Sequence, residues 1–133
     1  MASAAGLQVA HAWTNATAGP TALVYGEIHN DSQAEATLRS ASSDAADAAT
    51  MVGLQNAGGT LTMTPLPALP IGPGRTLELA PDELAIRLDG LGAPLQEGDS
   101  LEVDLAFDRT TIRVTVAVEA EQARSHSHAG HAH

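Results

Sequence analysis

Four of the six histidines lie within the last eight residues of the chain, where they form two His-x-His pairs separated by Ala129-Gly130. They are His126, His128, His131 and His133. Imidazole is the commonest protein ligand for copper, zinc and nickel. In an extended segment residues two apart point the same way, and a glycine between the pairs lets the second fold back toward the first. The spacing therefore predicts a metal-binding tail that prefers Cu(II) among divalent ions of the first row.

A second interpretation of the tail remains open. A polar, low-complexity end also serves to keep a protein soluble, or is left from an affinity extension, although such extensions are usually unbroken histidine runs. The residues from 120 to 133 have no apolar side chain larger than alanine with which to pack. We therefore expect a flexible tail at 120–133 that follows the folded domain.

Composition excludes several classes of function. The 133 residues are enough for one domain with an ordinary core, and the net charge of −10 carries no basic stripe that would bind nucleic acid. The absence of cysteine excludes disulfides and thiolate chemistry. No stretch approaches the roughly 20 apolar residues of a membrane span. Ala2-Ser3-Ala4 resembles the end of a secretory cleavage site, so we expect an exported, periplasmic protein in which residues 1–6 are a remnant of an export or cloning segment.

Alternating apolar residues dominate the rest of the chain. The clearest example is a predicted hairpin whose two strands are joined by Asp108-Arg109-Thr110 and each place one apolar face inward. Its inward residues are Leu101, Val103, Leu105 and Phe107, then Ile112, Val114, Val116 and Val118. Shorter strands are predicted at 7–13, 23–28, 37–42, 59–64, 75–79 and 84–88.

Turn residues recur about every ten positions, which is typical of an antiparallel sandwich or barrel. The Ala-rich segment 40–50 shows no repeating apolar face, so we expect a loop there with at most one helical turn. The fold class predicted is therefore all-β, with about 8–9 antiparallel strands in a domain that spans residues 7–119.

Several residues along this domain resemble one known family. They are Ala12-Trp13, Tyr25 with Ile28 and Asn30, Ser42-Ser43, Ile71-Gly72-Pro73-Gly74, Gly90-Leu91, Pro94-Leu95, Glu97-Gly98-Asp99, Leu105 and Phe107. In this order and spacing the chain is similar to the periplasmic copper chaperone A (PCuAC) family. The resemblance implies a cupredoxin-like Greek-key β-barrel and a role in copper binding and copper homeostasis.

The same resemblance implies where a copper site would lie. The family holds Cu(I) with a His, a Met eleven residues later and a His-x-Met pair about twenty-two residues further on. These positions fall on Val52, Met63, Ala85 and Arg87 in this chain. Only Met63 retains a ligand side chain, which makes a Cu(I) site in the barrel doubtful, and a cationic Arg87 opposes one. Met51 is a second candidate thioether, but it would need a bulge to share a face with Met63; ordinary packing is the alternative for both methionines.

Two histidines lie inside the predicted domain. His11 shares the expected inward side of its strand with Leu7, Val9 and Trp13, which predicts a hydrogen-bonded structural residue. His29 lies beside Asn30-Asp31 at a strand end and is expected to be exposed. A joint His11–His29 metal site is the minor alternative.

These observations leave two hypotheses for function. In the first, the protein handles copper as a chaperone-like carrier, binding Cu(II) through the tail and exchanging it with a periplasmic or membrane-associated cuproprotein or assembly factor. In the second, it is an interaction module that keeps the chaperone fold, binds no metal and docks a partner protein. Because no phosphate loop, zinc-protease helix or nucleophile elbow is present, we do not expect an enzyme.

Overall fold

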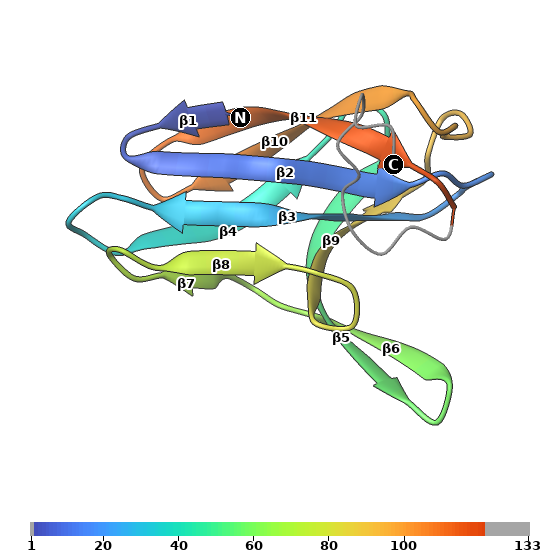
Figure 1. Cartoon of the computed structure of the whole chain (residues 1–133), viewed down its shortest axis with the longest axis horizontal. Helices are drawn as coiled ribbons and strands as arrows, with labels where there is room; N and C mark the ends of the chain where they lie inside the picture. Colours follow the sequence, from blue (N-terminus) through green and yellow to red (C-terminus); the bar gives the residue numbers. More distant parts are fainter. Residues whose placement is uncertain (1, 122–133) are drawn as a thin grey trace, which may run out of the picture.

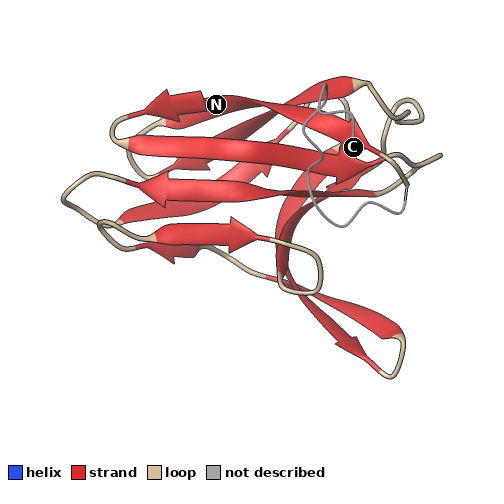
Figure 2. Ribbon diagram, in the orientation of Figure 1, coloured by secondary structure: helices blue, strands red, loops and turns tan. Residues whose placement is uncertain are grey.

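The computed structural model describes residues 2–121, and every regular element in that range is a strand (Figure 2). The eleven strands are β1 (Ala2–Ala4), β2 (Leu7–Asn15), β3 (Ala22–Asn30), β4 (Ala36–Ser42), β5 (Ala48–Ala57), β6 (Thr60–Pro65), β7 (Leu69–Ile71), β8 (Thr76–Leu79), β9 (Leu84–Asp89), β10 (Ser100–Phe107) and β11 (Thr111–Glu119). The four tail histidines lie outside the described residues. Within 2–121 no helix is long or apolar enough to cross a membrane.

The strands form one curved sheet in the order β6-β5-β9-β3-β2-β11-β10-β4-β7, with β1 added beside β2 and β8 beside β3. Its two halves fold over each other, so that β2 and β3 lie in front of β4 and β10 (Figure 1). All pairings are antiparallel except that of β11 with β2, which brings the end of the chain back to its beginning. The predicted all-β, cupredoxin-like class is confirmed, with eleven strands instead of eight or nine.

The main core fills the space between the two halves. Alternation along the predicted hairpin is confirmed, because Val103 and Val114 are paired across β10–β11 and both are buried. Leu38 from β4 and Ile28 from β3 have no exposed surface at all and meet in the same cluster. Branched aliphatic side chains thus supply most of the apolar burial that stabilises this domain.

The segment 40–50 differs from the predicted loop. Only residues 43–47 are irregular, and β5 begins at Ala48, which pairs with Asp89 of β9. Ala48 and its neighbour Ala49 have little strand propensity of their own. Pairing with β9, a strand distant in the sequence, decides the conformation of these two alanines, and the local sequence does not indicate it.

A β-bulge in β2 overturns the prediction that His11 points inward. The pairing of β2 with β3 shifts register between Ala10 and Trp13, and His11 has a φ of +56° and an exposed side chain. Gly26 lies against this bulge, and a Cβ there would come within 3.2 Å of the Ala12 Cα. Because the bulge inserts one residue, Leu7 and Val9 face the main core whereas Trp13 faces the other side of the sheet.

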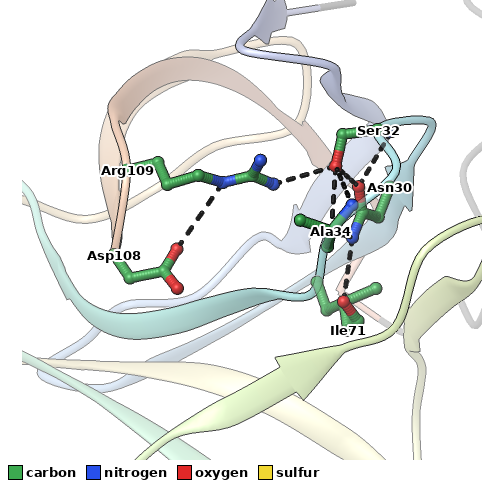
Figure 3. Close-up of polar contacts among 6 residues, drawn as sticks. All are labelled: Asn30, Ser32, Ala34, Ile71, Asp108 and Arg109. Carbon is green, nitrogen blue, oxygen red and sulfur yellow. Dashed lines mark hydrogen bonds and ion pairs between the residues drawn. The ribbon is translucent and has the colours of Figure 1, made fainter.

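One end of the sandwich is organised by Asn30, whose side chain is completely buried (Figure 3). Its Nδ2 donates to the carbonyl oxygens of Ala34 (2.8 Å) and Ile71 (2.9 Å), and its Oδ1 accepts from the Ser32 N–H (3.0 Å) and Oγ (2.6 Å). Arg109, in the β10–β11 turn, donates to the Ser32 Oγ at 3.0 Å. The Asn30 amide therefore ties the loop after β3 to the end of β7, and Ser32 joins the same loop to the β10–β11 turn.

Candidate functional site

The four positions implied by the family resemblance meet on one face of three neighbouring strands. Val52 of β5 lies directly opposite Ala85 of β9, and Arg87 lies opposite Thr50, two residues along β5 on the same face. On the other side of β5, Met63 of β6 is paired with Leu54. The register therefore brings together the four positions that the resemblance implies, and of the four only Met63 carries a ligand side chain.

These side chains do not offer a soft metal the ligands it needs. Val52 and Ala85 are buried and carry no donor atom. The Arg87 Nη1 lies 3.9 Å from the Met63 Sδ, so a cation occupies the space beside the one thioether. Cu(I) bound here would have a single sulfur ligand and a neighbouring positive charge, which is an unfavourable combination.

Arg87 is held in this position by polar partners. Its Nε lies 3.0 Å from the Asp89 Oδ1, and the Thr21 hydroxyl donates to the same oxygen at 3.1 Å. The Arg87–Asp89 pair was not singled out in the sequence. The signal available was the spacing, because residues two apart in a strand share a face. About 40% of each side chain is exposed, so this ion pair contributes little to stability.

A second hydrophobic cluster surrounds the candidate site. It comprises Trp13, Tyr25, Val52, Leu54 and Ala85, with Leu23 and Met63 packed against it. The rings of Trp13 and Tyr25 stack with centroids 4.7 Å apart and planes tilted by 40°. Trp13 belongs to this cluster only because the β2 bulge redirects it, so the aromatic surroundings of the site could not be found from alternation along the strand.

Met51 does not join Met63. It is buried in the main core and is paired with Ile86, on the face of β5 opposite to Val52. No bulge interrupts the pairing of β5 with β9 at this point. Met51 therefore packs as an ordinary core residue in this structure, and Met63 is the only one of the two that lies at the family's ligand positions.

The two histidines of the domain, His11 and His29, lie in different surroundings. The His29 Nδ1 lies 2.8 Å from the Thr76 Oγ1 and its Nε2 lies 3.3 Å from the Glu27 Oε1, with the imidazole half-exposed. His11 is exposed on the bulge. Among the described residues no three His, Asp or Glu side chains are grouped so that they could hold a metal ion.

The perturbed pKa values lie away from the candidate site. On β10–β11 the Arg113 guanidinium donates to both carboxylate oxygens of Asp104, at 2.9 and 3.2 Å. This hydrogen bond, more than the accompanying attraction of charges, holds the pKa of Asp104 below its ordinary value of 3.8. The same contact raises the pKa of Arg113. Both groups lie in solvent and belong to the outer surface of the hairpin.

Comparison with known proteins supports the family assignment. The sequence model of the family described as "Putative lipoprotein LpqE-like" matches residues 7–119. A relative from Leifsonia xyli subsp. xyli, "Putative lipoprotein Lxx21020", is 34% identical over 116 residues, which cover 86% of this chain and 70% of that protein.

Solved structures of PCuAC domains share the fold. The copper-bound PCuAC domain from PmoF2 superposes with a TM-score of 0.75 at 18% identity, covering 90% of this chain and 98% of that domain. The Cu(I) form of DR1885 from Deinococcus radiodurans superposes with a TM-score of 0.67 at 25% identity, covering 90% of this chain and 83% of that protein. The resemblance noted in the sequence is therefore confirmed: this chain belongs to the LpqE-like family and has the fold of the PCuAC copper-binding domains.

Proposed function

We propose that this protein is an exported copper-handling protein that binds copper through its C-terminal histidines and not through the barrel. The observation that carries the proposal is the contact between Arg87 and Met63, at 3.9 Å, in the place where a Cu(I) ligand set would have to assemble. With the barrel positions occupied by Val52, Ala85 and Arg87, the two His-x-His pairs are the remaining concentration of metal ligands in the sequence.

Several findings support a role in copper handling. The fold is that of proteins solved with copper bound, including the Cu(I) form of DR1885. Imidazole nitrogens bind Cu(II) more tightly than Ni(II) or Zn(II). The relative in Leifsonia xyli is described as a lipoprotein, which agrees with an exported location. We propose that the domain acts as a carrier and that the tail exchanges copper with a periplasmic or membrane-associated cuproprotein.

Equilibrium titration with Cu(II) tests this function directly. We expect replacement of His126, His128, His131 and His133 by alanine to lower the Cu(II) affinity by at least about 100-fold, or about 3 kcal/mol. The matched control replaces the two domain histidines, with His11→Ala and His29→Ala, and should leave the affinity unchanged. Binding should also weaken as the pH falls below about 6.5, where protons compete for the ring nitrogens.

A second candidate function is favoured by the same contact. A guanidinium beside a small apolar patch is suited to bind a carboxylate on a partner protein, and such a module would need no metal. In that case the alanine variants of the tail would bind Cu(II) as weakly as the unaltered protein. Equal, weak affinity in both forms contradicts the copper proposal and favours docking.

A further inference from the structure

The hairpin formed by β5 and β6 differs in charge from the rest of the molecule. Between Asp47 and Arg75 the chain contains no charged side chain and no histidine, although the whole protein has a net charge of −10. Figure 1 shows this hairpin projecting from the body of the sandwich. Leu61, near the tip of the hairpin, is a large hydrophobic residue that is 42% exposed. Another negatively charged molecule can therefore approach this hairpin with less repulsion than it meets elsewhere.

The outer edge of β6 has no neighbour among the described strands. β6 stands at the end of the strand order and is paired with β5 alone. Edge strands are commonly protected by charges or by proline. β7, at the other end of the order, has Pro70 at its centre, whereas β6 has no proline before Pro65. The segment 60–64 is therefore an unprotected edge.

The hairpin geometry determines which groups point outward from this edge. The turn residues Gly58 and Gly59 have φ values of +61° and +83°, and the closing pair is Ala57 with Thr60. In a two-residue hairpin the closing pair exchanges hydrogen bonds, and every second pair does so from there. The Leu66 N–H donates to the Met51 carbonyl at 2.8 Å, which continues this alternation. The main-chain N–H and C=O groups of Leu61 and Met63 consequently point away from β5.

The sequence of this edge is complementary to itself. Thr60-Leu61-Thr62-Met63-Thr64 has threonines at alternate positions and an apolar residue on each side of its centre. We propose that two copies of this chain pair edge to edge through β6, antiparallel and with a two-fold axis at Thr62. Leu61 then exchanges main-chain hydrogen bonds with Met63 of the partner subunit, and Met63 with Leu61 of the partner subunit.

The side chains fit this arrangement. Leu61 and Met63 lie on the same face of β6, the face that continues into the second cluster through Leu54. Directly opposite residues in an antiparallel pair also share a face, so each leucine packs on a methionine and a threonine ladder lies on the other side. The β6 strand of a second copy therefore matches both faces of β6, and its hairpin adds no charged side chain to the interface.

A single cysteine at the two-fold axis tests the proposal, because the 133 residues contain no other cysteine. In the dimer the two Thr62 residues form a non-hydrogen-bonded pair with Cα atoms about 4.5 Å apart, within reach of a disulfide. Gln55 lies opposite Thr62 on β5 and is exposed on the same face, but its two copies would be roughly 14 Å apart. We expect T62C to form disulfide-linked dimers at least ten times more than Q55C under mild oxidation.

Variants that block pairing complete the test. Since the Leu61 N–H is not used by β5, L61P in the T62C background should reduce cross-linking to the Q55C level. L61K places a charge at the edge and should also reduce cross-linking to the Q55C level. It keeps the test valid if proline disturbs the hairpin. Fluorescence of the buried Trp13 reports whether the fold is retained. Equal cross-linking of T62C and Q55C, or cross-linking unaffected by L61P and L61K, would overturn the proposal.

Discussion

The loops around Asn30 and the surface around Val52 and Arg87 both lie at positions that match the PCuAC family in sequence order, but they differ in what they retain. Asn30 is one of the residues that carry the resemblance, and its side chain makes four hydrogen bonds to Ser32, Ala34 and Ile71. Val52, Ala85 and Arg87 occupy the ligand positions without the ligand atoms. The difference teaches that this chain keeps the buried amide that joins its loops while the positions implied for copper carry valine, alanine and arginine.

Restoring the ligands should have the largest effect. The triple variant V52H/A85H/R87M would add two imidazoles and a thioether to Met63 and remove the guanidinium from its side. We expect a gain in Cu(I) affinity of at least about a thousandfold, or about 4 kcal/mol, in competition with a chromogenic chelator. M63A in the triple variant is the control and should abolish most of the gain. No gain at all would mean that these four positions do not form a site.

Removal of the Asn30 side chain should have the next largest effect. Asn30→Ala leaves the carbonyl oxygen of Ile71 without its side-chain donor and the Ser32 N–H without its acceptor, while the Ala34 oxygen keeps only the Ser32 hydroxyl. We expect a loss of about 2–4 kcal/mol in the free energy of unfolding, measured with urea. Asn56→Ala, on the exposed part of β5, should change it by less than about 0.5 kcal/mol. Similar losses in both variants would contradict the role given to Asn30.

A truncation in the second cluster should cost less. Val52→Ala removes buried apolar volume next to Ala85, and we expect a loss of about 1–2 kcal/mol in the same urea measurement. The copper-binding properties should not change, because valine supplies no ligand. A loss as large as that of Asn30→Ala would show that this surface is as important to the fold as the buried amide.

The smallest effect concerns a site outside both regions. Because Arg113 lowers the pKa of Asp104 in the folded protein, their contact stabilises the fold above the unfolded pKa of 3.8, and this stabilisation is lost as the pH falls through the folded pKa. Asp104→Asn should lower the melting temperature slightly at neutral pH and not at all in strong acid. High salt should reduce the difference at neutral pH, since both groups are exposed. A difference that grows on acidification would contradict this account.

The sequence predicted strands with one buried face and also the exposed β6, at 59–64, but it failed where neighbours decide the conformation. Alternation identified β10 and β11, whose inward residues are all buried. It did not identify β5, because Gln55, Asn56 and Ala57 are exposed on both faces of a projecting hairpin. His11 was assigned to the wrong face because the bulge, which lies against Gly26 of β3, shifts the register of β2, and no local pattern reveals this shift.

The candidate site was predictable only in part. The family resemblance located the four positions, and the register of β5, β6 and β9 places them on one face. The contact of Arg87 with Met63 and the pairing of Arg87 with Asp89 depend on side-chain directions in β6 and β9, which the sequence does not report. The tail histidines were identified from their spacing, and copper binding by them stays a prediction.

The proposed function depends on Val52, Met63, Ala85 and Arg87 not holding copper. The chain has one tryptophan, Trp13, and it lies in the second cluster with Val52, Ala85 and Met63, so a copper ion bound there would quench its fluorescence. The most direct measurement is an anaerobic Cu(I) titration of the chain ended at Ala120, followed by this fluorescence. We predict no saturable quenching; stoichiometric quenching that M63A removes would contradict the account.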